Sequence, residues 1–513
     1  MMRLDKALRA VVAAVGMAMG AAGPAMAEQP LAVIDWLGRN DTPSVPAAQP
    51  RPAEPPVART ALVPDVAVAP LAQGGPRLIG LVPPEVTGLP VGLWSGSTLD
   101  TLTRLLTDLP DPTLPAAQAL LYTVLLAEAH APGGTPSDGD ALALARVEKL
   151  MQQGALDPAQ SLMEQAGVTR SAAHFDLWMQ ISLLTGTEGR ACDLLQTASH
   201  LTQDYGIRIF CAARAGRWED AALTFGSAEA LDLLPREKLD LLARFLDPEA
   251  MEAAASPVPP RRMDPLSFRL FETIGEPLPT GNLPRTYAVA DLRDLSGWKA
   301  QLEAAERLTR AGALPDNRLL GLYTDRRPAA SGGIWDRVAD MQRFETALAS
   351  GSAEAVAKTL PPVWEAMRAA RLEVPFATLF ADRLAPFTLP GPAQSVSEKV
   401  QLLSPAYEAT AARIGGDSPA VRVALGEPPT AQPADLQKAA IHDAFTAPAP
   451  RTDLVEMARK DRLGEAILRT LVLLDAGTTG KPKALAEALA TLRALGLEDT
   501  ARRAALQILL LER

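Results

Sequence analysis

The stretch Ala215-Gly216-Arg217-Trp218-Glu219-Asp220-Ala221-Ala222-Leu223 continues through Ala230-Leu231-Asp232-Leu233-Leu234-Pro235. A glycine that can end one helix is followed two residues later by an aromatic residue, then by small alanines, and a proline closes the stretch. Small residues let paired helices approach closely, and an aromatic side chain can fill the gap near the turn. The stretch therefore predicts a hairpin of two packed helices, with Trp218 filling the gap.

This pattern resembles the second half of a tetratricopeptide repeat, and the repeat-like unit lies near residues 206–235. The resemblance lacks the tryptophan of the first helix and a steady period of about 34 residues. It implies a helical hairpin that stacks on its neighbours, and it implies no catalytic residue.

Helical patterning extends on both sides of this unit. Ser97-Thr98-Leu99-Asp100 resembles a capping box, and short helical segments with Gly, Pro or Asp breaks follow to the end of the chain. About twenty short antiparallel helices without strand alternation predict an all-α, irregular helical-hairpin solenoid. The Pro-rich break predicts a linker at 256–263 between an N-terminal half, 97–255, and a C-terminal half, 264–513.

The amino terminus has the three zones of a secretory signal peptide. Arg3, Lys6 and Arg9 precede a short apolar stretch, and Ala25-Met26-Ala27 has the pattern of a cleavage site. We expect residues 1–27 to direct export to a bacterial periplasm, with cleavage after Ala27. The alternative is a retained anchor, although the apolar stretch is short for a bilayer.

An apolar segment and a Pro-rich segment come next. Within 28–42, Leu31, Ile34 and Leu37 would share one helical face beside Trp36, so these four residues form a candidate docking segment for this protein or another. The alternative is hydrophobicity left beside the signal sequence. Residues 43–96 are rich in proline, with 12 between 43 and 90, and we expect an extended tether there.

Cys192 and Cys211 are the only cysteines. An oxidising compartment favours pairing them, and their spacing suits a helical hairpin with its turn near Asp204-Tyr205-Gly206. We expect a structural disulfide; two separate buried thiols are the alternative. Two cysteines and four scattered histidines offer no metal-ligand spacing, so no metal is expected.

Composition excludes several classes of protein. The chain is 48% hydrophobic, which excludes wholesale disorder, and only 4% aromatic, which disfavours a β-sandwich or barrel. Its net charge of −10 disfavours nucleic-acid binding, because neutralising phosphates requires Lys and Arg. After the signal peptide no stretch is long and apolar enough to predict stable membrane insertion.

Catalytic and cofactor motifs are not evident. His130, His174, His200 and His442 form no zinc-protease pattern, and Gly477-Thr478-Thr479-Gly480-Lys481 lacks the glycine spacing of a phosphate loop. We therefore expect no cofactor and no catalysis.

Arginine and aromatic residues are concentrated in the region 281–345. These residue types dominate binding hot spots. The candidate partner-binding residues are Arg318, Tyr323, Arg326, Arg327 and Trp335. Alternatively, Trp298 and Trp335 fill gaps between helices and the arginines cap helix ends.

Two stretches resemble a group of exported bacterial proteins named "antifreeze glycopeptide polyprotein". They are Ala27-Glu28-Gln29-Pro30-Leu31 with Ile34-Asp35-Trp36-Leu37, and 321–333, Gly-Leu-Tyr-Thr-Asp-Arg-Arg-Pro-Ala-Ala-Ser-Gly-Gly. The resemblance implies an uncharacterised family and transfers no catalytic residue.

The sequence as a whole predicts a periplasmic helical-repeat scaffold that binds a protein partner of the cell envelope. One alternative is an accessory component of an envelope machine such as a motor or secretion system. The other is a cell-wall-active enzyme with an acidic catalytic residue.

Overall fold

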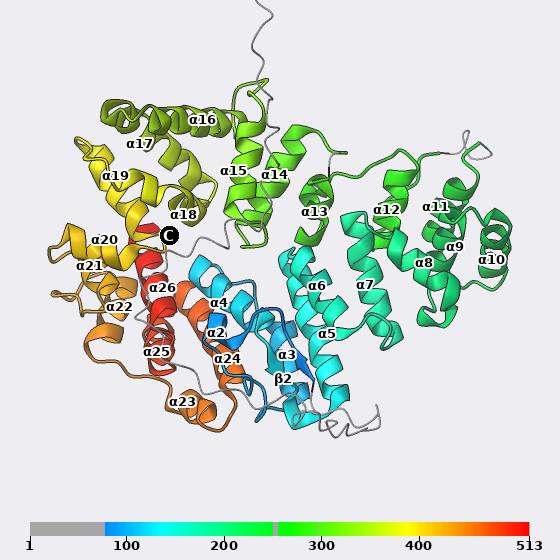
Figure 1. Cartoon of the computed structure of the whole chain (residues 1–513), viewed down its shortest axis with the longest axis horizontal. Helices are drawn as coiled ribbons and strands as arrows, with labels where there is room; N and C mark the ends of the chain where they lie inside the picture. The colour runs from blue at the N-terminus through cyan, green and yellow to red at the C-terminus, as the bar shows by residue number, and fades with distance from the viewer. Residues whose placement is uncertain (1–76, 250–254, 294, 512–513) are drawn as a thin grey trace, which may run out of the picture. The chain divides into compact units, whose positions relative to one another are not determined.

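The computed structural model describes residues 77–249, 255–293 and 295–511. Within these residues the chain forms 25 α-helices and one antiparallel ladder of two very short strands (Figure 1). The predicted all-α helical-repeat fold is therefore confirmed. The signal peptide, the docking segment with Leu31, Ile34, Trp36 and Leu37, and the tether up to residue 76 lie outside the described residues.

The first three helices lie in the sequence between the two strands of a short ladder, in which Leu78 pairs with His130 and Ile79 pairs with Ala129. The elements of this part are β1 (Leu78–Ile79), α2 (Pro84–Thr87), α3 (Leu99–Asp108), α4 (Pro115–Leu126), β2 (Ala129–His130), the 3-10 helix η3 (Pro132–Gly134), α5 (Pro136–Gln153), α6 (Leu156–Ala166) and α7 (Ala172–Thr185).

The disulfide hairpin and the repeat-like unit follow. Their elements are α8 (Gly189–Thr197), η4 (Ser199–Leu201), α9 (Tyr205–Arg214), α10 (Trp218–Ala230), α11 (Arg236–Leu246) and α12 (Pro265–Thr273). The Asp204 side chain accepts hydrogen bonds from the backbone N–H groups of Gly206 and Ile207, which starts α9 at the predicted turn.

The region that holds the candidate site comprises η5 (Thr280–Asn282), η6 (Arg285–Tyr287), α13 (Ala288–Asp291), α14 (Trp298–Thr309), α15 (Asp316–Asp325), α16 (Ile334–Ser350), α17 (Ala353–Ala369), α18 (Glu373–Leu384) and α19 (Pro392–Leu402). The C-terminal helices are α20 (Tyr407–Ile414), α21 (Pro419–Ala424), α22 (Leu436–Thr446), α23 (Thr452–Ala458), α24 (Leu463–Thr478), α25 (Pro482–Ala494) and α26 (Glu498–Leu511).

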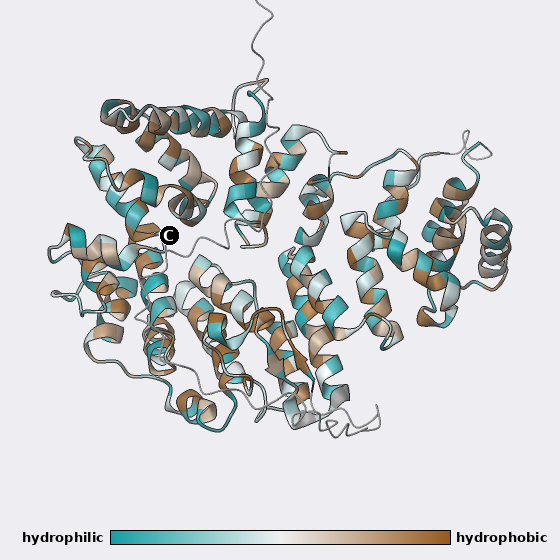
Figure 2. Cartoon of the chain, viewed as in Figure 1, coloured by the Kyte–Doolittle hydropathy of each residue, from teal (hydrophilic) through white to brown (hydrophobic). Residues whose placement is uncertain are grey.

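Consecutive helices pack as hairpins, most extensively in the pairs α5–α6, α9–α10, α16–α17 and α24–α25. Figure 2 shows apolar and polar residues side by side on the same helices. Such amphipathic helices bury one face against their neighbours and leave the other in water.

The end of the predicted tether is packed rather than extended. Leu93 and Trp94 are fully buried in the core. The buried guanidinium of Arg146 donates to the carbonyl oxygens of Ile79, Leu125 and Ala127 at 2.9, 2.7 and 2.8 Å. Burial lowers the pKa of Arg146 to about 10, so the side chain remains cationic at neutral pH. Residues 77–96 therefore belong to the folded body. Their buried apolar side chains and backbone hydrogen bonds hold them in place although the segment is rich in proline.

The apolar interior also divides differently from the predicted halves. One cluster combines buried residues from 79–290 with others from 402–506, and a second contains residues 288–403 and Leu511. Helix α12, which lies in the predicted C-terminal half, packs against α7 and α11. The Pro-rich break at 256–263 interrupts the helices, but the apolar face of α12 returns to the core that precedes the break.

The C-terminal helix α24 packs against α3 and α4, and α26 packs against α4 (Figure 1). The backbone N–H of Ala116 at the start of α4 donates to the Gln507 side chain of α26 at 3.0 Å. Segments about 400 residues apart in the chain thus share one core.

Candidate functional site

Arg326 and Arg327 follow the last residue of α15 and are exposed. They border an open hollow of about 530 Å³ between the end of α15, one side of α16 and the end of α18. We call this the arginine hollow. It is lined by Thr324, Asp325, Arg326, Arg327, Gln342, Glu345, Thr346, Ala349 and Arg383.

Hydrogen bonds from α16 hold the wall of the arginine hollow. The Gln342 Nε2 group donates to the carbonyl oxygens of Tyr323 at 2.8 Å and Arg326 at 2.6 Å. The turn that presents the two arginines is therefore fixed to α16.

The three guanidinium groups of the hollow differ in their partners. Arg326 donates to Asp325 at 2.9 Å. Arg383 donates to Glu345 at 2.8 Å and lies over the Phe380 ring, 5.6 Å from its centroid. Within the described residues the Arg327 side chain has no hydrogen bond and no ion pair. The hollow thus holds three cations against two carboxylates, and one cation is free to bind a ligand.

A buried cluster around Glu306 connects α15 and α16, two of the helices that border the hollow, with α14. Arg337 of α16 donates to both carboxylate oxygens of Glu306 at 2.7 and 2.8 Å, and the Tyr323 hydroxyl donates to Oε1 of Glu306 at 2.7 Å. Burial, reinforced by the Glu306 carboxylate, raises the pKa of Tyr323 well above its ordinary value. These contacts join α14, α15 and α16.

The structure therefore corrects the predicted role of Tyr323. Its side chain is 0% exposed, so it is a core residue and not part of a partner surface. A tyrosine is common both in binding surfaces and in helix cores, so the sequence alone did not distinguish the two roles. The hydrogen bond from the Tyr323 hydroxyl to the buried Glu306 assigns this tyrosine to the core.

Trp335 and Arg318 also lie outside the hollow. Trp335 is half-buried and packs on Trp298, with ring centroids 5.2 Å apart. The Trp298 Nε1 group donates to the carbonyl oxygen of Leu322 at 3.0 Å. Arg318 is exposed on α15 but does not line the hollow. Both tryptophans thus fill a gap between helices, which was the alternative interpretation of the sequence.

Sequence reasoning missed Arg383, Gln342 and Glu345. Arg383 follows Arg327 by 56 residues, and it enters the hollow only because α18 packs against α15. On its own helix it has the pattern of any exposed arginine, so the sequence carries no signal for it.

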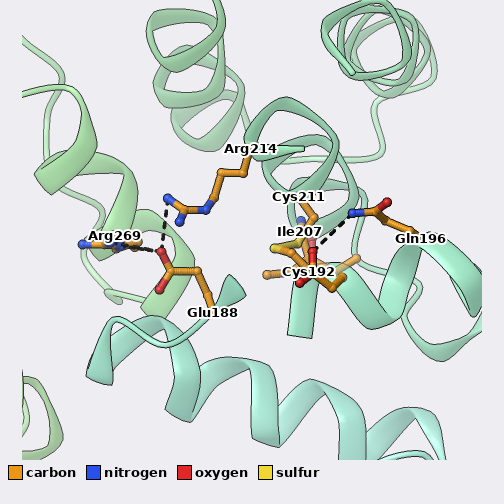
Figure 3. The surroundings of a disulfide bond; sticks show 9 residues. Glu188, Cys192, Gln196, Ile207, Cys211, Arg214 and Arg269 are labelled. Carbon is orange, nitrogen blue, oxygen red and sulfur yellow. Dashed lines mark hydrogen bonds and ion pairs between the residues drawn. A yellow bond between two sulfur atoms is a disulfide. The ribbon is translucent and has the colours of Figure 1, made fainter. Parts of the chain in front are cut away.

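The sulfur atoms of Cys192 in α8 and Cys211 in α9 lie at disulfide distance, 2.00 Å apart (Figure 3). Nearby, the buried Glu188 forms ion pairs with Arg269 at 3.0 Å and with Arg214 at 3.3 Å. The expected pairing of the cysteines thus agrees with the structure of the hairpin.

Three buried glutamates are engaged by arginines. Glu188 pairs with Arg214 and Arg269, Glu306 with Arg337, and Glu465 with Arg462 and Arg469. The guanidinium groups compensate for the water that each buried carboxylate loses. Within the described residues no group of three or more His, Cys, Asp or Glu side chains could hold a metal ion.

The fold places the chain among the all-α helical-repeat proteins. No protein family, no curated protein and no solved structure matches it. None of the helices that the structure describes combines the length and the apolar character needed to cross a membrane.

Proposed function

We propose that this protein is an exported helical-repeat scaffold of the periplasm that binds a protein partner of the cell envelope and has no catalysis of its own. The partner binds at the arginine hollow. Export after cleavage at Ala27 is part of this proposal, supported by the signal-like amino terminus and by the disulfide-distance cysteine pair.

One observation carries the proposal. Three arginines from two separate parts of the fold converge on one open hollow, and the Arg327 guanidinium has no partner among the described residues. Arginine forms planar, multiple hydrogen bonds with carboxylates and is enriched at binding hot spots. The Gln342 side chain holds the turn, so little ordering is required when a partner binds.

Replacing Arg326 and Arg327 by alanine tests this function. Hot-spot residues contribute roughly 1–4 kcal/mol each when truncated, so we expect envelope proteins recovered with the wild-type chain to be lost from the double variant. Folding should change little, because exposed ion pairs contribute about 0–1 kcal/mol. The measurement is affinity capture from an envelope extract, compared with thermal melting of both proteins.

Arg318→Ala is the matched control, since Arg318 is an exposed arginine of α15 outside the hollow. It should recover the same proteins as the wild type. Equal recovery by all three proteins would contradict the assignment of the hollow. Unfolding of the double variant would show that the two arginines are structural.

A further inference from the structure

A second hollow lies on the neighbouring face of α16, between α16 and α17, with a volume of about 680 Å³. We call it the alanine trough. It is lined by Ala339, Gln342, Arg343, Thr346, Ala347, Ser350, Ala355, Lys358 and Thr359. Gln342 and Thr346 line the arginine hollow as well. The two hollows therefore meet along the surface of α16, and together we call them the α16 groove.

The α16 groove is electropositive within an acidic protein. Its lining contains five cations, Arg326, Arg327, Arg343, Lys358 and Arg383, against the two carboxylates Asp325 and Glu345. The chain as a whole has a net charge of −10. Within the described residues neither Arg327 nor Lys358 has a hydrogen bond or an ion pair. One unpaired cation thus lies at each end of the groove.

The two ends of the groove differ in apolar character. Ala339, Ala347 and Ala355 give the trough small apolar walls, and the only ionised side chains of its lining are Arg343 and Lys358. Arg343 is paired with Asp340. Small apolar walls can accept leucine-sized side chains, and binding is favoured in proportion to the apolar surface that each such side chain removes from water.

We propose that the α16 groove binds a peptide segment of a protein partner whose carboxylates enter the arginine hollow and whose apolar side chains fill the alanine trough. This inference rests on the proposed function and specifies its ligand. Charge complementarity selects acidic residues for the arginine end. The small alanine walls select apolar residues for the trough.

A nucleic acid is the less suitable polyanion for this groove. No aromatic side chain lines either hollow, so there is no platform on which bases could stack. The acidic remainder of the protein also repels a long polyanion, whereas a short peptide contacts only the groove.

Thr346 provides the sharpest test, because it lines both hollows and is exposed. Its hydroxyl bonds only to the Gln342 carbonyl in the preceding turn, at 2.8 Å, so replacement leaves α16 intact. Thr346→Glu places a negative charge and a longer side chain at the junction. Thr346→Ala is the matched control.

The probe is a fluorescein-labelled ten-residue peptide with three glutamates followed by three leucines, and fluorescence anisotropy of the full mature chain measures its Kd. We expect Thr346→Glu to weaken binding about tenfold or more and Thr346→Ala, which introduces neither charge nor bulk, to change it much less. Lys358→Ala should weaken binding by a smaller factor than Thr346→Glu. Lys483→Ala, at an exposed lysine on α25, should not weaken it.

Two peptide analogues separate the contributions of the two ends. Replacing the glutamates by glutamine should weaken binding and remove its salt dependence, and replacing the leucines by serine should weaken it at all salt concentrations. Equal binding of the serine analogue would overturn the role of the trough. Equal binding to both Thr346 variants, or tighter binding of a single-stranded oligonucleotide, would overturn the ligand class.

The inference and the function on which it rests fail in different ways. If the parent peptide does not bind while envelope partners still require Arg326 and Arg327, the ligand class is wrong and the scaffold function stands. If partner capture is insensitive to Arg326 and Arg327, the scaffold function at this site is wrong.

Discussion

The carboxylate of Glu188 is surrounded by protein, with 0% of its side chain exposed. Removing a carboxylate from water costs several kcal/mol unless cations replace its hydration. Arg269 of α12 and Arg214 at the end of α9 supply those cations. Glu188 directly precedes α8, which carries Cys192, while α9 carries Cys211 (Figure 3). The Glu188–Arg214 ion pair therefore joins the start of α8 to the end of α9, and the cysteine pair joins the same two helices.

We predict that mature protein from the periplasm begins at Glu28 and contains no free thiol. A disulfide across 19 residues limits the unfolded chain and contributes roughly 3 kcal/mol. Cys192→Ala/Cys211→Ala should therefore melt at a lower temperature than the oxidised wild type. Amino-terminal sequencing, alkylation under non-reducing conditions and thermal melting provide the measurements.

Reduced wild-type protein is the control for this double variant, and the two should melt at similar temperatures and retain helical circular dichroism. Two alkylatable thiols in freshly isolated periplasmic material would contradict the disulfide. A cytoplasmic protein that begins at Met1 would contradict the export.

At the scale of single residues, the sequence predicts a side-chain pair when the two residues have no other possible partner. It misses a pair whose partners are brought together only by the packing of the helices. The two cysteines had no other partner, so their pairing followed from count and spacing. Glu306 and Arg337 are 31 residues apart among 60 acidic and 50 basic residues. No local pattern marks that pair, and the same ambiguity led to the assignment of Tyr323 to the surface.

At the scale of the element, the alanines of the repeat-like unit are packed as the sequence predicts, whereas its tryptophan is not. Ala221 and Ala228 are the buried residues of α10, and α10 packs closely on α9. Trp218, expected to fill the gap near the turn, is 52% exposed. The closing proline, Pro235, precedes α11 as its N-cap residue. Small residues define this crossing, and the half-exposed aromatic side chain does not fill it.

We predict that Ala221→Leu destabilises the chain whereas Ala222→Leu does not. Ala221 is 0% exposed at the crossing of α9 and α10, and a leucine there forces the helices apart at a cost of roughly 1–3 kcal/mol. Ala222 is exposed on the same helix, where surface substitutions change stability by about 0.5 kcal/mol or less.

Chemical denaturation of both variants measures the difference. The two proteins have the same composition, so a difference in midpoint reports the position of the leucine alone. If both variants unfold at the wild-type midpoint, α10 is not closely packed on α9.

At the scale of the whole molecule, the fold depends on contacts between the two ends of the described chain. The N–H of Gly464 in α24 donates to the Leu93 carbonyl at 2.9 Å, and the N–H of Gly96 donates to the Asp461 carbonyl at 2.8 Å. Close by, Glu465 is 0% exposed and pairs with Arg462 and Arg469 at 2.8 Å. Burial alone would raise the pKa of Glu465, but hydrogen bonds from the two arginines hold it below its ordinary value. Because its pKa is lowered in the folded chain, the ionised Glu465 carboxylate contributes to stability at neutral pH. The contribution is lost only as the pH falls and Glu465 becomes protonated.

These end-to-end contacts explain why helix identity was predictable and domain organisation was not. Periodicity and capping are local, so the sequence predicts helices such as α3, which begins after the cap residue Thr98. The contact of α24 with residues 93–96 joins positions about 370 residues apart. Nothing local to either segment indicates the other, so residues 77–96 resembled a tether and 256–263 resembled a boundary.

We predict that Gly464→Ala separates the two ends of the described chain. A Cβ atom at Gly464 would lie 2.4 Å from the ring atoms Cε3 and Cζ3 of Trp94 and 3.0 Å from the Leu93 carbonyl oxygen. Trp94 is itself fully buried, so it cannot yield without opening the core. The loss of stability should be roughly 1–3 kcal/mol, or more if the ring is displaced.

Gly189→Ala is the matched control, because Gly189 also lies in the first turn of a helix and its Cβ would meet no atom within 4 Å. That control should be as stable as the wild type or slightly more stable, since alanine favours a helix over glycine by about 1 kcal/mol. Thermal melting gives the change in stability, and hydrogen exchange at the backbone amides of positions 96 and 464 reports the contact itself. Faster exchange at these amides in Gly464→Ala, with wild-type exchange in Gly189→Ala, is the expected result. Unchanged exchange in Gly464→Ala would mean that Trp94 does not seat against α24 and that the two ends are held together elsewhere.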